Sequence, residues 1–368
     1  MSKAYKRLAY EGIRILALAF IPTLPCGRAR DFPPGKLTRK ITMGYFSRFS
    51  KLKNPYPKPL IVILLGLTVA FLNTGCIGNS QSDSNKSSSN NLNSPVDPAE
   101  NSQQQLSSLS IVMIPSQNSE EQKEKRELFA DYLEEKLGLP VNIQIPENYD
   151  TAIDLIAEGK VQMAYLGPFS YVKAKQRNSK LEPIVAYIDR RTGRPSYTST
   201  IVANTESGIK TIEDLKGKRF GFVNQSSTSG YLVPLSHLVS QNIDPEKDFT
   251  EVLYMGSHNK NAAALEAGKI DAAGINKPTY LNAQKSGQLS PEKYQLLWES
   301  DPIPNAPIVI SRELPADFIS NLQKALINAP PDMAALSGAK SDGYTLVQDR
   351  DYEPIRELQR TLGLKTAE

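Results

Sequence analysis

Short apolar stretches alternate with helical patterns of polar and apolar residues from residue 109 to the end of the chain. Residues 109–114 are a predicted strand, and the next stretch repeats apolar side chains at i and i+4, which predicts a helix that Ser119 caps and Gly138 ends. Further strands are expected at residues 141–145, 161–166, 219–223, 252–255 and 270–274. Strands that alternate with helices are typical of the α/β class, which we therefore predict.

The remaining pattern predicts the other helices of this body. They are expected at residues 150–159 with Asp150 as the cap, at the turn 211–217, and at 230–241, 315–328 and 352–362. Residues 302–310 read as an extended segment that crosses back towards the first part of the body. The stretch of about 260 residues is long enough for two lobes of ordinary domain size.

Three predicted strands lead directly into the start of a helix. These junctions are residues 161–170, where Pro168 suits the first helical position, residues 219–234, and residues 257–268. The first N–H groups of a helix lack partners within it and lie at the positive end of its dipole, so each junction can bind an anion. The pattern predicts a small anion held between two lobes.

The junction at residues 219–234 contains four successive hydroxyl side chains, from Ser226 to Ser229, which we call the hydroxyl turn. Hydroxyls and N–H groups of one turn can converge on a tetrahedral anion. A turn that only caps its own helix is the alternative, but two hydroxyl residues would suffice for that. We therefore favour binding.

The first 108 residues have a different pattern. Residues 60–72 form an uncharged apolar run that is too short for a membrane span but suited to the core of a signal peptide. The basic residues before it are Arg48, Lys51, Lys53 and Lys58. The run ends at Cys76 in a sequence that resembles a bacterial lipoprotein box, although Asn73 stands where leucine is usual. Ordinary cleavage or an uncleaved anchor is the alternative reading.

These features divide the front of the chain into three parts. Residues 43–75 are a predicted signal peptide that begins at Met43, and residues 1–42 are a predicted upstream extension that does not belong to the protein. Residues 76–108, rich in Ser, Asn and Gln, are predicted to be a lipidated cysteine followed by a flexible tether.

Charge and cysteine content limit the function. Residues 1–59 have a net charge of +11, whereas the remainder has −7, so the basic pI does not indicate nucleic-acid binding. Of the two cysteines, Cys26 lies in the upstream extension and Cys76 is used for lipidation. We therefore expect no disulfide, no cysteine-based metal site and no cofactor.

The body resembles the phosphate/phosphite/phosphonate-binding proteins of bacterial ABC importers, a branch of the periplasmic binding proteins. The matching stretches are residues 165–171, 197–199, 213–219, 227–230, His258 with Ala263 and Gly268, and residues 303–304. The resemblance implies a two-lobed type II fold in which each lobe is a sheet flanked by helices and the ligand lies in the cleft between them. It places lobe 1 at residues 109–201 with a return segment at 301–368, and lobe 2 at residues 202–300.

The resemblance also implies roles for individual residues. Ser227, Thr228 and Ser229 would hold the phosphorus oxyanion, and His258 would donate a hydrogen bond to it. The other residues expected to line the cleft are Tyr197, Tyr149, Tyr165 and Ser170. The alternatives are a local role at a helix start for His258 and aromatic packing for the tyrosines. His237, on a predicted helix, is interpreted as a packing or surface residue.

One departure from the family concerns ligand choice. The family often has an aspartate two residues after the Ile303–Pro304 pair, where it accepts the proton of a singly protonated oxyanion, but this chain has Ala306. Asn305 is a poor substitute, because neighbouring side chains of an extended segment point in opposite directions. The choice among phosphonate, phosphite and phosphate therefore stays open.

The sequence thus predicts a monomeric solute receptor on the outer side of the cell membrane, held there by a lipid. It would bind a phosphorus oxyanion and deliver it to the permease subunits of an ABC importer. A sensor lipoprotein that passes ligand occupancy to a signalling partner is the first alternative. A phosphoester hydrolase is the second, but the chain has no Gly-x-Ser-x-Gly elbow and only two histidines.

Overall fold

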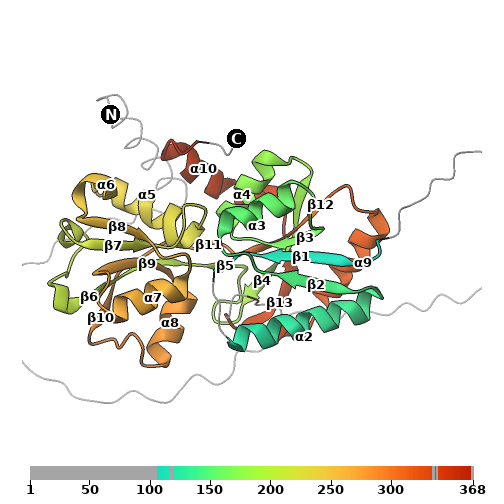
Figure 1. Cartoon of the computed structure of the whole chain (residues 1–368), viewed down its shortest axis with the longest axis horizontal. Coiled ribbons are helices and arrows are strands. Elements are labelled where there is room, and N and C mark those ends of the chain that lie inside the picture. Colours follow the sequence, from blue (N-terminus) through green and yellow to red (C-terminus); the bar gives the residue numbers. More distant parts are fainter. Residues whose placement is uncertain (1–105, 117–119, 334–335, 337–338, 366–368) are drawn as a thin grey trace, which may run out of the picture. The chain divides into compact units, whose positions relative to one another are not determined.

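The computed structural model describes residues 106–116, 120–333, 336 and 339–365 (Figure 1). The predicted upstream extension, the signal peptide and Cys76 lie outside these residues, as does the tether except for its last three positions. Each helix in the described ranges is too short or too polar to cross a membrane.

A six-stranded mixed sheet forms the first part of the body, with the strand order β13-β4-β12-β3-β1-β2. β1 pairs in parallel with both β2 and β3, whereas β12 pairs antiparallel with β3 and β4, and β13 antiparallel with β4. The strands are β1 (Leu109–Met113), β2 (Val141–Gln144), β3 (Met163–Tyr165), β4 (Leu181–Asp189), β12 (Pro307–Ser311) and β13 (Ser341–Leu346).

Helices cover both faces of this sheet, which explains the continuous apolar strands (Figure 1). In β1, Leu109 and Ile111 pack in one core with Phe129, whereas Val112 packs in the opposite core with Ile153. The helices on the first face are α2 (Glu120–Leu137) and α9 (Ala316–Ile327), and those on the second are α3 (Tyr149–Ala157), α4 (Pro168–Arg177) and α10 (Glu353–Thr361).

A five-stranded sheet forms the second part, with the order β10-β6-β9-β7-β8. β7 pairs in parallel with β8 and β9, and β6 pairs antiparallel with β9 and β10. The strands are β6 (Ser199–Asn204), β7 (Arg219–Phe222), β8 (Glu251–Tyr254), β9 (Ala272–Asn276) and β10 (Tyr294–Glu299). The helices are α5 (Val233–Ser240) and α6 (Pro245–Asp248) on one face, and α7 (His258–Glu266) and α8 (Lys277–Lys285) on the other. Both sheets are flanked by helices, as predicted.

The chain passes between the two sheets through a small antiparallel ribbon. β5 (Ser196–Tyr197), which follows β4, pairs with β11 (Ile303–Pro304), which precedes β12, and Tyr197 lies opposite Ile303. The extended crossing expected at residues 302–310 is therefore present. The first strand of the second sheet, β6, already begins at Ser199, two residues before the predicted lobe boundary at 201. The boundaries at 201 and 301 therefore stay predictions.

Short 3₁₀ helices lie in the connections. They are η1 (Thr205–Ser207), η2 (Glu213–Leu215), η4 (Pro331–Met333) and η5 (Asp349–Tyr352). η2 is the turn expected at residues 211–217.

Two helix starts differ from the prediction. α3 is capped by Asn148, whose side chain accepts the N–H of Thr151 at 2.8 Å, and not by Asp150, whose carboxylate accepts a hydrogen bond from Ser226. The helix expected from residue 230 begins earlier, as a π-helical turn, η3 (Thr228–Leu232), that continues into α5. Such turns occur frequently at functional sites.

Candidate functional site

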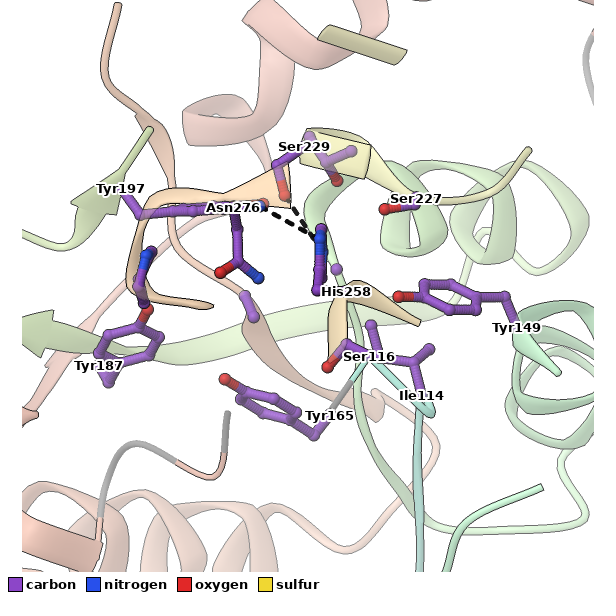
Figure 2. A pocket seen from close by; sticks show the side chains of 14 residues that line it. Ile114, Ser116, Tyr149, Tyr165, Tyr187, Tyr197, Ser227, Ser229, His258 and Asn276 are labelled. Atoms are coloured by element: carbon purple, nitrogen blue, oxygen red, sulfur yellow. Dashed lines mark hydrogen bonds between the residues drawn. The ribbon is translucent and has the colours of Figure 1, made fainter. Parts of the chain in front are cut away.

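A small cavity of about 40 Å³ lies where residues of both sheets meet (Figure 2). A single water position needs about 10–15 Å³ by this measure, so the cavity suits a ligand of a few non-hydrogen atoms. Its lining residues are Ile114, Ser116, Tyr149, Tyr165, Gly167, Tyr187, Tyr197, Ser227, Thr228, Ser229, His258, Asn276, Pro278 and Ala306.

The hydroxyl turn bends tightly at the end of β7. The N–H of Val223 donates to the carbonyl of Gly230 at 2.9 Å, which holds the turn against the end of the strand. A Cβ atom on Gly230 would lie 2.4 Å from Cγ2 of Val223 and 2.9 Å from Oγ of Ser227. The turn therefore requires glycine at this position because there is no space for a side chain.

Backbone N–H groups orient two hydroxyls of the turn. The N–H of Phe169, in the first turn of α4, donates to Oγ1 of Thr228 at 2.8 Å, and the N–H of Gly230 donates to Oγ of Ser227 at 3.1 Å. Each hydroxyl accepts in these bonds and keeps its own proton to donate. The first of these bonds also joins the helices of one sheet to the turn of the other.

His258 is held as a neutral hydrogen-bond donor. The N–H of Asn276 donates to Nδ1 of His258 at 3.1 Å, and Nε2 lies 3.5 Å from Oγ of Ser229 (Figure 2). Burial lowers the pKa of His258 to about 3, so the ring is neutral. Because Nδ1 accepts, the single ring proton is assigned to Nε2, on the side of the hydroxyl turn.

Two tyrosine hydroxyls add neutral donors. Tyr149 is buried on α3, and in the described part of the chain its hydroxyl makes no hydrogen bond, although the Ser227 hydroxyl lies near it. Burial raises the pKa of Tyr149 well above its usual value and that of Tyr197 to about 12, against the opposing effect of neighbouring hydroxyls. Figure 2 shows the hydroxyl of Tyr149 pointing towards His258.

The structure brings together all but one of the residues predicted to bind the ligand: Ser227, Thr228, Ser229, His258, Tyr197, Tyr149 and Tyr165 line the cavity. Ser170 does not line it, because its hydroxyl donates to the carbonyl of Ser226 at 2.8 Å. His237 stacks on the ring of Trp298 at 4.1 Å, as a packing residue does.

Sequence reasoning missed several lining residues, of which Asn276 is the clearest. Its Oδ1 accepts the N–H of Thr279 at 2.7 Å and so caps α8, which starts directly after β9. Asparagine before a Lys-Pro pair at a strand end was the signal of a fourth strand-to-helix junction. Ser116, Ile114, Tyr187 and Pro278 gave no comparable local signal.

The end of β11 confirms the expected orientation of two neighbours. Ala306 lines the cavity, whereas the side-chain amide of Asn305 donates to the carbonyl of Tyr187 at 2.8 Å. None of the lining residues named above is acidic or cationic. In the described ranges no group of three His, Cys, Asp or Glu residues could hold a metal ion.

Comparisons with known proteins agree on one family. The model of the family "ABC transporter, phosphonate, periplasmic substrate-binding protein" matches residues 111–352. The chain is 28% identical over 281 residues to the phosphonates-binding periplasmic protein of Escherichia coli, covering 73% of this chain and 80% of that protein. It is 26% identical over 276 residues to the phosphate-import protein PhnD of Mycolicibacterium smegmatis, covering 69% and 86%.

A solved structure supports the same relationship. It is the binding-protein component of an ABC phosphonate transporter from Pseudomonas aeruginosa, which superimposes with a TM-score of 0.63 at 26% identity. The match covers 69% of this chain and 87% of that one.

Proposed function

The chain belongs to the periplasmic substrate-binding proteins of phosphonate ABC transporters, and on this premise we propose that its cavity captures one phosphorus oxyanion (a phosphonate, phosphite or phosphate) for delivery to a membrane permease. Proteins of this family bind a solute for import and act outside the cytoplasm. The predicted two-lobed periplasmic binding-protein fold is confirmed, with the six-stranded sheet in one lobe and the five-stranded sheet in the other.

The observation that carries the proposal is the convergence of neutral donors from both lobes on one small cavity. Thr228, Ser229 and His258 belong to the second lobe, Tyr149 belongs to the first, and Tyr197 lies on the connecting ribbon. Donors that are already oriented suit an anion whose charge is spread over several oxygens. The first N–H groups of η3 add their dipoles at the same place.

Contacts between the lobes explain how binding would couple to closure. Besides the bond from Phe169 to Thr228, the N–H of His258 donates to the carbonyl of Ser116 at 3.0 Å. Ser226 adds its hydroxyl, which donates to Asp150 at 2.6 Å. A ligand in contact with both lobes stabilises this arrangement, by about 2.7 kcal/mol at a hundred times its dissociation constant.

We infer that the site binds without catalysis. Ser229 and His258 lie side by side, but Nε2 of His258 carries the proton and Nδ1 is occupied by a backbone N–H. A neutral ring with a pKa of about 3 does not accept the proton of a serine hydroxyl. This arrangement favours a receptor over a hydrolase.

We also infer that Cys76 carries a lipid and that residues 77–108 tether a monomeric body to the membrane. The support is the order of basic, apolar and small residues before the cysteine. Globomycin treatment of expressing bacteria, which blocks lipoprotein processing, should cause an unprocessed form to accumulate, and Cys76→Ser should release the mature protein from the membrane.

A thermal-shift panel tests the proposed function. Phosphite, methylphosphonate, phosphate and sulfate are added separately to the purified protein. We expect at least one phosphorus oxyanion to raise the melting temperature, and to do so more than sulfate at equal concentration. If none of the three changes it, the proposal is wrong.

A further inference from the structure

The polar groups around the cavity are arranged to donate hydrogen bonds. Oγ1 of Thr228 accepts from Phe169, Oγ of Ser227 accepts from Gly230, and Nδ1 of His258 accepts from Asn276. In each group a backbone N–H already occupies an acceptor position and the group's own proton stays available to donate, although each hydroxyl oxygen keeps one further lone pair. The side chain of Asn276 follows the same rule, since its oxygen accepts from the N–H that it caps.

Charged acceptors are missing from the lining. The titratable residues that line the cavity are Tyr149, Tyr165, Tyr187, Tyr197 and His258. The charged groups packed against the hydroxyl turn lie behind it: Asp150 on α3 accepts from the Ser226 hydroxyl, and Nζ of Lys173 on α4 lies 2.9 Å from the same hydroxyl. Neither belongs to the lining described here.

Part of the remaining wall is apolar. Ile114, Pro278 and Ala306 contribute aliphatic groups, and the tyrosines add ring surface. A P–OH group placed among these donors and aliphatic groups would find only neutral hydroxyl oxygens as acceptors, and these bind its proton more weakly than a carboxylate does. A hydrogen atom or a methyl group on phosphorus has no such requirement.

We propose, on the basis of the function proposed above, that this site selects a phosphorus oxyanion that is fully deprotonated and carries no hydroxyl. It therefore takes the dianion of phosphite or of methylphosphonate in preference to inorganic phosphate, which keeps at least one P–OH near neutral pH. Three charged oxygens accept from the donors of the hydroxyl turn, His258 and the tyrosines. The fourth substituent is small and apolar.

His258, Tyr149 and Tyr197 do not change charge in the pH range in which the ligands ionise. Burial lowers the pKa of His258 to about 3 and raises that of Tyr197 to about 12, with Tyr149 also raised. These groups stay neutral from roughly pH 5 to 9. A change of affinity in this window therefore does not come from these three groups, and the different second pKa values of the two ligands separate ligand ionisation from that of Lys173, whose pKa is lowered by burial.

Calorimetric titration of the full chain with phosphite and with methylphosphonate, across a pH series, tests the inference. We expect the dissociation constant of each to weaken about tenfold per pH unit below that ligand's own second pKa and to level off above it. The two bends should differ by the difference between the two second pKa values. Phosphate should bind at least about tenfold more weakly than phosphite at the pH of the plateau.

Each of the other outcomes contradicts a different part of the inference. A flat profile, tighter binding at low pH, or bends at one common pH for both ligands overturn the selection of the dianion but leave the proposed function intact. Phosphate that binds as tightly as phosphite overturns the exclusion of the hydroxyl. Absence of binding by all three ligands at every pH overturns both proposals.

A substitution at Ala306 gives an independent test. Ala306→Asp places a charged acceptor in the lining and should keep or raise affinity at low pH, while binding at high pH weakens. Ala306→Asn adds similar volume without the charge and should keep the wild-type bend. An Ala306→Asp protein with a wild-type melting temperature and a wild-type profile contradicts the inference. If the aspartate variant does not fold, the pH series of the two ligands on the wild-type protein still tests the inference by itself.

Discussion

Nδ1 of His258 accepts the backbone N–H of Asn276 at 3.1 Å, and this bond determines what the ring can do. It fixes the ring on the end of β9 and leaves the proton on Nε2, which faces Ser229. A positively charged ring would need an acceptor for its Nδ1 proton and would meet an N–H there instead. His258 is therefore a fixed neutral donor, and the charge of a bound anion is not balanced by it.

This arrangement predicts how stability depends on pH. The pKa of His258 is about 3 in the folded protein and 6.5 in an ordinary environment, so between these values the unfolded chain binds a proton that the folded chain does not. As far as this one group is concerned, the free energy of unfolding is therefore highest above pH 6.5. It falls as the pH falls, by up to about 1.4 kcal/mol per pH unit. Urea unfolding of the wild type and of His258→Asn, from about pH 4 to 6.5, should show a shallower slope in the variant.

His237 provides a control for the ligand-binding role of His258. Its pKa is also lowered by burial, but it stacks on Trp298 and does not line the cavity. His237→Gln should therefore leave ligand affinity unchanged, whereas His258→Asn should reduce it. Equal slopes for His258→Asn and the wild type would show that His258 is protonated in the folded state.

Gly230 in the hydroxyl turn and Gly167 in the cavity lining should respond differently to alanine. At Gly230 a Cβ would lie 2.4 Å from Val223, so Gly230→Ala should lower stability by about 1–3 kcal/mol and distort the hydroxyl turn. At Gly167 the nearest atoms would be 3.5 Å away, so Gly167→Ala should fold normally. Its new methyl group enters the cavity beside Thr228 and should reduce affinity. Chemical denaturation and calorimetric titration separate the two effects, and a Gly230→Ala protein of wild-type stability would contradict the turn geometry.

Substitution of Tyr149 distinguishes a ligand-binding role of its hydroxyl from a structural one. It is buried without a hydrogen-bond partner among the described residues, so Tyr149→Phe removes a group that contributes little to the unliganded fold. Stability should stay the same or rise. Affinity for the phosphorus oxyanion should fall by about 1–3 kcal/mol, or roughly 5- to 150-fold. Unchanged affinity together with reduced stability would assign this tyrosine to the core.

Local chemistry explains which parts of the site could be predicted from the sequence. The hydroxyl turn was found because four hydroxyl residues in a row exceed what one cap requires, and the structure places Ser227, Thr228 and Ser229 at the cavity. The strand before it was recognisable because Phe220 and Phe222 belong to a short apolar run that ends in a turn. These signals depend on neighbours along the chain.

The parts that the sequence did not reveal depend on distant partners. Asp150 and Asn148 are both good caps, and Asn148 takes this role while the Asp150 carboxylate bonds Ser226, 76 residues away. Ser170 is the last residue of a predicted junction, yet its hydroxyl donates to the carbonyl of Ser226. Tyr187 reaches the cavity from the long strand β4, where nothing in the local pattern marks it. Only the packing of the two lobes decides these directions.

The most direct measurement of the central claim is a calorimetric titration of methylphosphonate into the wild-type protein and into the double variant Ser227→Ala, Thr228→Ala. We expect one ligand per wild-type chain and at least about a hundredfold loss of affinity in the double variant, because two hydrogen bonds to a charged ligand are removed, each worth about 1.5–3 kcal/mol. The far-UV circular dichroism of the unliganded double variant should match that of the wild type. Wild-type affinity in a folded double variant would show that the hydroxyl turn only caps its helix and does not bind the ligand.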